Sequence, residues 1–175
     1  MHAHLLPTHA GAAAAVPDGS LASCRLDAAD GSGWLLALTD DPSAPYEVEQ
    51  LSARPHGSGA SAAVVEFDGP RDAVQVAADR RASVERVAPA ALQVEGSLGA
   101  VVLRAADGAM VTVAFADSPA ALDASSRAIL STPLLPGEDP ALLGGPDRYT
   151  ACRVVGDEVA ALLRRSVAAV PAVPA

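Results

Sequence analysis

One segment of the chain occurs twice, and this internal repeat limits the possible folds more than any other feature. Gly19–Ala44 aligns without a gap to Gly96–Ala121, and 12 of the 26 aligned residues are identical. The identities outside alanine are Gly, Ser, Leu, Asp and Pro residues, which set turns and buried positions. A repeat of this length predicts two structural units of the same kind.

Each copy of the repeat predicts a β-hairpin, because an Asp-Gly pair stands between two apolar runs. Glycine accepts the positive φ that a tight turn between antiparallel strands requires. In the last strand of the second hairpin, Val111, Val113 and Phe115 share one face. Thr112 and Ala114 share the other face, because side chains alternate along a strand. Each hairpin is therefore expected to have one face of large apolar residues and one of small residues.

A strand and a helix are expected before the second hairpin. The apolar run Ala62–Phe67 predicts the strand, and Gly69-Pro70 opens a helix that ends near Pro89. Apolar residues at helical spacing predict the buried stripe of this helix. The residues of that stripe are Val74, Ala77, Val84 and Ala88.

A second helix and a last strand are expected after that hairpin. Ser118 is a good N-cap with Pro119 in the first helical turn, and the helix should end near Thr132. A Pro- and Gly-rich loop over 131–147 leads to the strand Tyr149–Val155, and a short amphipathic helix is expected over Glu158–Val167.

This order of elements predicts an α+β fold, a ferredoxin-like βαββαβ domain with an antiparallel sheet over residues 60–168. Residues 19–53 are expected to form a partial tandem copy, a hairpin plus the strand Tyr46–Ala53, without helices. We expect a flexible N-terminus over 1–18 and a frayed tail over 169–175. The two copies would form an α/β barrel, within one chain or between two.

Composition excludes several classes of function. A net charge of −9 argues against nucleic acid and against an anionic membrane surface. No window approaches 18 continuous apolar residues, so no transmembrane helix is expected. Residues 1–18 have no Lys or Arg that would start a signal peptide. Cys24 and Cys152 each lie in an apolar run, which predicts buried free thiols in a cytoplasmic protein.

The second unit resembles the antibiotic biosynthesis monooxygenase domain of the dimeric α/β barrel superfamily. The resemblance covers about residues 60–156 and rests on the Asp-Gly hairpin, the helix start Asp117–Ala121 and a last strand that begins with Tyr149. It implies a homodimer and an apolar ligand, of polyketide or aromatic type, held between sheet and helices. It further implies oxygenation that requires neither a metal nor an organic cofactor.

The chain departs from this family at the residues that carry catalysis. Members that oxidise polyketides or degrade haem rely on an Asn, a Trp and a His. This chain has no Asn, Ala116 stands at the position of the Trp, and no His lies between Ala60 and Ala175. Whether the protein is an enzyme therefore stays open. The alternative is a non-catalytic barrel that binds a second copy of itself or another protein.

Hydrogen-bond donors of the second unit are the candidate substrate-binding residues: Arg104, Thr112, Arg127 and Tyr149. An arginine can hold a carboxylate or enolate with two hydrogen bonds, although a solvated surface charge is the common alternative for any one of them. No catalytic residue is predicted. The first copy lacks helices, so an uncovered face or edge of its sheet predicts homodimerisation.

Other polar groups have simpler interpretations. His2, His4 and His9 are expected in the flexible N-terminus rather than in a metal site, and His56 in a linker. The acidic pair Glu138-Asp139 precedes a proline and predicts a turn. No metal site is therefore expected.

Overall fold

A computed structural model describes residues 1–9, 15–54, 59–156 and 163 of the chain. Its strands are β1 (His2–His9), β2 (Ser20–Ala28), β3 (Ser32–Thr39), β4 (Tyr46–Ala53), β5 (Ser61–Phe67), β6 (Ser97–Ala105), β7 (Met110–Ala116) and β8 (Arg148–Val155). Its helices are α1 (Ala73–Ala82), the π-helical segment η1 (Ser83–Val87), α2 (Ala88–Leu92) and α3 (Pro119–Ser131).

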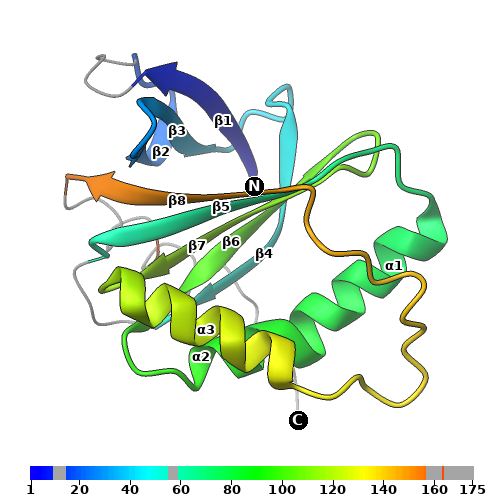
Figure 1. Cartoon of the computed structure of the whole chain (residues 1–175). Helices are drawn as coiled ribbons and strands as arrows, with labels where there is room; N and C mark the ends of the chain where they lie inside the picture. Colours follow the sequence, from blue (N-terminus) through cyan, green and yellow to red (C-terminus); the bar gives the residue numbers. More distant parts are fainter. Residues whose placement is uncertain (10–14, 55–58, 157–162, 164–175) are drawn as a thin grey trace, which may run out of the picture.

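The eight strands of the described residues close into one antiparallel barrel within a single chain, in the order β1-β3-β2-β8-β5-β7-β6-β4. Two units of four strands make up this order. Strands β5 to β8, with α1 and α3 as their crossovers, have the ferredoxin-like topology that the sequence predicts. Strands β1 to β4 repeat the same relative order without helices. The three α-helices lie together against the β5–β8 half (Figure 1).

Both predicted hairpins are confirmed, since β2 pairs with β3 and β6 pairs with β7. Each hairpin has a β-bulge near its open end. The bulge lies between Ser20 and Ala22 in the first hairpin and between Ser97 and Gly99 in the second. These are the same positions of the aligned repeat. The matching registers support the interpretation of a duplicated unit, which remains a prediction.

The expected flexible N-terminus is wrong for His2–His9, which form β1. This strand pairs with β3 along its whole length, and Ala3 is fully buried. The segment alternates weakly, so its sequence does not show a strand. The free backbone edge of β3 orders it through ladder hydrogen bonds. The first unit thus has four strands rather than a hairpin and one strand.

The predicted buried stripe of the first helix is also wrong. Val74 and Val84 are 62% and 50% exposed, whereas Asp79 and Ala82 face inward. The carboxylate of Asp79 forms buried ion pairs, and these turn a partly polar face of α1 toward the sheet. Apolar spacing alone therefore indicates the wrong face.

Several expectations lie outside the described residues. They are the linker residues 55–58, including His56, the tail 169–175 and, apart from Leu163, the helix expected over Glu158–Val167. Among the helices that the structure describes, none is long and apolar enough to cross a membrane.

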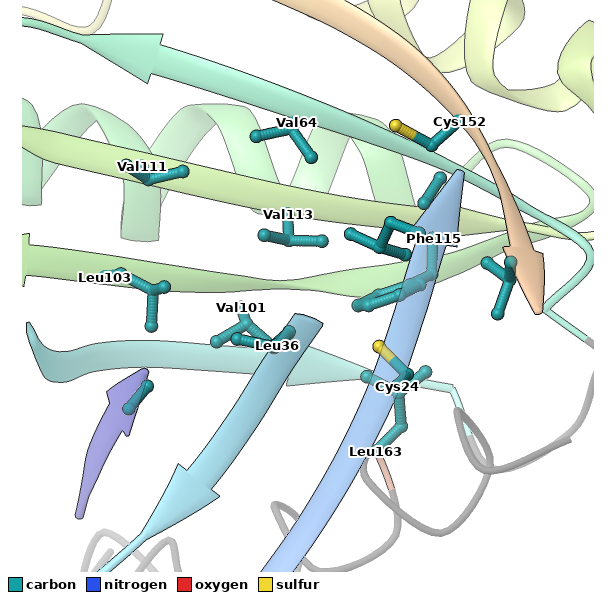
Figure 2. Packing of buried hydrophobic residues seen from close by; sticks show 14 of the residues in the cluster. Cys24, Leu36, Val64, Val101, Leu103, Val111, Val113, Phe115, Cys152 and Leu163 are labelled. Carbon is teal, nitrogen blue, oxygen red and sulfur yellow. The ribbon is translucent and has the colours of Figure 1, made fainter. Parts of the chain in front are cut away.

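The barrel interior is the main hydrophobic core (Figure 2). Val64, Val113 and Val101 are paired side by side on β5, β7 and β6, and all three are fully buried. Cys24 and Cys152 belong to the same core, and neither forms a disulfide within the described residues. Burial raises the pKa of the Cys152 thiol to about 11, so this thiol stays protonated at neutral pH.

Gly99 is required where β4 crosses the bulge of β6. Its φ is +119°, and a Cβ at this position would overlap the backbone of Ser52. We expect Gly99→Ala to lower the free energy of unfolding by about 3 kcal/mol or more, measured by urea denaturation. The control is Gly144→Ala, where a Cβ meets no atom within 4 Å. Equal stability of the two variants would contradict this role for Gly99.

Candidate functional site, a cavity between sheet and helices

A cavity of about 780 Å³ lies between the outer face of β5 to β7 and the helices. This volume is within the range of ~300–1,000 Å³ that is usual for small-molecule sites. The strands supply one wall, η1 and α3 supply another, and the loop over residues 132–147, here called the covering loop, supplies a third.

Small side chains form part of the sheet wall of the cavity, beside larger ones such as Val65, Val102 and Met110. Ala63 on β5, Ala100 on β6, and Thr112 and Ala114 on β7 all line it. Their neighbours along each strand point into the barrel, because successive side chains of a strand alternate. The small-residue face predicted for the second hairpin is therefore confirmed at Thr112 and Ala114, which face the cavity.

The helical wall includes a π-helical turn. Ser83, Arg86 and Val87 of η1 line the cavity, as do Leu122 and Ile129 of α3. A π-helical turn inserts an extra residue per turn and is frequently found at functional sites. The hydroxyl of Ser83 donates to Oε1 of Gln50 on β4, at 2.7 Å, which ties this turn to the sheet.

Two arginines hold the covering loop against α1 and η1. The Nε of Arg86 lies 3.0 Å and 3.3 Å from the two carboxylate oxygens of Glu138. Arg81 donates to the carbonyl oxygen of Pro136 at 2.9 Å. Glu138 also accepts a hydrogen bond from the backbone N–H of Leu135 at 2.7 Å. The predicted acidic turn thus forms an ion pair that joins the covering loop to a cavity-lining arginine.

An arginine–carboxylate network of five residues lies at the α1 end of the sheet. Asp79 of α1, which also lines the cavity, pairs with Arg71 at 2.9 Å and Arg104 at 3.4 Å. Arg104 is buried on β6 and pairs with Glu49 at 2.7 Å, and Glu49 also pairs with the exposed Arg80. Each buried charge of the network therefore has an opposite charge beside it.

The four predicted ligand residues occupy different places. Thr112 and Tyr149 line the cavity, and within the described residues neither hydroxyl has a protein hydrogen-bond partner. Arg104 belongs to the network and is not among the lining residues. Arg127 is exposed on α3 and does not line the cavity. The structure thus brings two of the four together at the cavity.

Asp79 and Arg86 line the cavity although the sequence did not indicate them as site residues. They are seven positions apart, with Ser83 between them, and this spacing places all three on one side of a helix. The signal is weak because charged residues are usual on a solvated helix face. It becomes informative only when the exposure of Val74 and Val84 shows which face is turned inward.

Metal-ligating side chains do not gather in this part of the chain. Among the described residues, no group of three or more His, Cys, Asp or Glu side chains is placed to hold a metal ion. His2, His4 and His9 lie on β1, which belongs to the helix-free unit.

Comparison with solved structures identifies the fold. The chain is similar to a candidate monooxygenase from Lactobacillus acidophilus NCFM, with a TM-score of 0.53, 7% identity, and 80% of this chain and 78% of that chain covered. It is also similar to a ferredoxin-fold protein from Listeria monocytogenes that is related to antibiotic biosynthesis monooxygenases, with a TM-score of 0.52, 12% identity, and 89% and 95% covered.

A third similar structure is an anthrone oxidase-like protein, with a TM-score of 0.50, 13% identity, and 89% of this chain and 92% of that chain covered. No protein-family model and no curated sequence matches the chain. The resemblance to the antibiotic biosynthesis monooxygenases is thereby confirmed at the level of the fold.

The network is expected to depend on Asp79 more than on its other members, because two arginines share the Asp79 carboxylate. Asp79→Asn keeps the shape but leaves Arg71 and Arg104 short of negative charge in a buried place. We expect a loss of about 3–5 kcal/mol in the free energy of unfolding, measured by urea denaturation. Asp123→Asn, at an exposed position of α3, is the control and should change stability by less than about 0.5 kcal/mol. An unchanged midpoint for Asp79→Asn would refute the assignment.

Proposed function

We propose that the protein is a monooxygenase-like α/β barrel that binds an apolar small molecule in the cavity between sheet and helices. The observation that carries this proposal is the cavity itself, whose surface is mostly apolar and includes fifteen Ala, Val, Leu and Ile residues among its thirty-six lining residues. Twelve polar or charged side chains interrupt this surface, among them six serines, Thr112 and Tyr149. Such a surface suits a ligand with an apolar body and one or two polar atoms.

The proposed binding requires neither a metal nor an organic cofactor. Oxygenation of a phenol without a cofactor would need fixed donors for the substrate anion. The chain's free donors at the cavity include the hydroxyls of Thr112 and Tyr149, whereas the family's Asn, Trp and His are missing. We therefore infer that binding is the primary function and that oxidation of phenols or haem is weak or absent.

Assembly and location complete the proposal. A homodimer in the cytoplasm remains our prediction. Barrel closure removes the free sheet edge that would favour a dimer. Its remaining support is the outer face of β1 to β3, which lies away from the three α-helices (Figure 1).

Filling the cavity should abolish binding. Ala114→Phe places a ring in the cavity from the sheet wall, and it leaves the barrel interior unchanged because Ala114 points outward from the barrel. We expect the affinity for the fluorescent alcohol pyrenebutanol to fall at least about tenfold in a fluorescence titration. The control is Ala120→Phe, at an exposed position of α3. Equal affinity of both variants and the wild type would place binding elsewhere.

Oxygen uptake separates a binder from an enzyme. With a panel of electron-rich phenols, we expect the wild type to consume oxygen no faster than the buffer. The matched variants are Tyr149→Phe and Arg127→Ala, since only Tyr149 lines the cavity. Robust uptake that Tyr149→Phe abolishes and Arg127→Ala preserves would instead establish a catalytic site in this cavity.

A further inference from the structure

We infer that the cavity selects uncharged ligands and that Glu138 sets this selectivity by neutralising Arg86. The inference rests on the proposed function, because it takes the cavity to be a ligand site. It adds the chemical class of the ligand: an apolar molecule whose polar atoms are neutral acceptors such as carbonyl or hydroxyl oxygens.

Two charged residues line the described walls, Asp79 and Arg86, and each is neutralised by the protein. Arg71 and Arg104 pair with the carboxylate of Asp79. Glu138 pairs with the guanidinium of Arg86. A carboxylate or ammonium group of a ligand would therefore lose its hydration in the cavity without gaining an unpaired opposite charge. Such a loss is far costlier for an ion than for a hydroxyl.

Glu138 can affect ligand binding through its charge but not through direct contact, because of where it lies. Glu138 does not line the cavity, but lies in a groove between α1 and the covering loop, behind Arg86. The side chains of Arg86 and Glu138 are 12% and 4% exposed, so solvent screens their attraction little. Arg86 thus presents donors to the cavity while its positive charge is balanced from behind.

The guanidinium of Arg86 retains donors for a ligand. Its hydrogen bonds to Glu138 come from Nε, and within the described part of the chain its two terminal nitrogens have no protein acceptor. A charge-balanced arginine with free N–H groups suits a neutral carbonyl or hydroxyl oxygen. The hydroxyls of Thr112 and Tyr149 supply further polar contacts.

A matched pair of probes tests the inference. Pyrenebutanol and pyrenebutyrate have the same ring system and chain and differ in their terminal alcohol or carboxylate. In fluorescence titrations at neutral pH, we expect the wild type to bind the alcohol at least about tenfold more tightly than the carboxylate. Equal or reversed affinities would overturn the inference while leaving the proposed binding site intact. Failure of both probes to bind would contradict the proposed function itself.

The variant Glu138→Gln tests the source of the selectivity. It keeps the size of the side chain and an oxygen for the Leu135 N–H, but it leaves the charge of Arg86 unbalanced. We expect the affinity for pyrenebutyrate to rise at least about tenfold, with the affinity for pyrenebutanol changed less than about twofold. Glu85→Gln is the control, because Glu85 pairs with Arg81 on the exposed side of the helix at 3.5 Å.

The double variant Arg86→Met/Glu138→Gln removes both charges and should lose the gain for the carboxylate. A gain that persists in the double variant would show that Arg86 is not its source and would overturn the inference. Circular dichroism checks that each variant is folded. If Glu138→Gln does not fold, the comparison of the two probes on the wild type still decides whether the cavity discriminates by charge.

Discussion

Closure of the sheet is the constraint on which the rest of this molecule depends. Each unit of four strands leaves two edges unpaired, and an unpaired edge leaves backbone N–H and C=O groups without partners. Here β4 pairs with β6 and β2 pairs with β8, so each unit closes the other. The large apolar residues then share one interior. The outer face of β5 to β7 remains available for the helices and the cavity.

Electrostatic pairing shapes the cavity as much as packing does. Asp79 of α1 is bound to two arginines, and Arg86 of η1 is bound to the covering loop through Glu138. Because buried charges are tolerated only when paired, these contacts fix the orientation of the helix and the position of the loop together. The polar face of α1 turns inward for the same reason. Ion pairs thus hold the cavity walls in place, and the charged residues that line the cavity are each paired with an opposite charge.

The sequence predicts those features that depend on residues close together in the chain, such as turns and the two faces of a strand. The Asp-Gly turns gave the two hairpins, and alternation along β7 gave the small-residue face with Thr112. Partners distant in the chain decide the remainder. His2–His9 is a strand because β3 offers an edge, and Arg104 is buried because Glu49 and Asp79 surround it. Neither fact has a signature in the neighbouring residues, so both escaped prediction.

Because side chains alternate along β5 to β7, one face of this sheet packs in the barrel interior and the other face lines the cavity. Successive residues of one strand therefore have different roles. Val113 packs in the barrel interior, whereas Ala114 lines the cavity. Substitutions on the cavity side can change the shape of the cavity without disturbing the packing of the barrel interior. The shape of the cavity can therefore be altered by substitution at positions that carry none of the packing of the barrel interior.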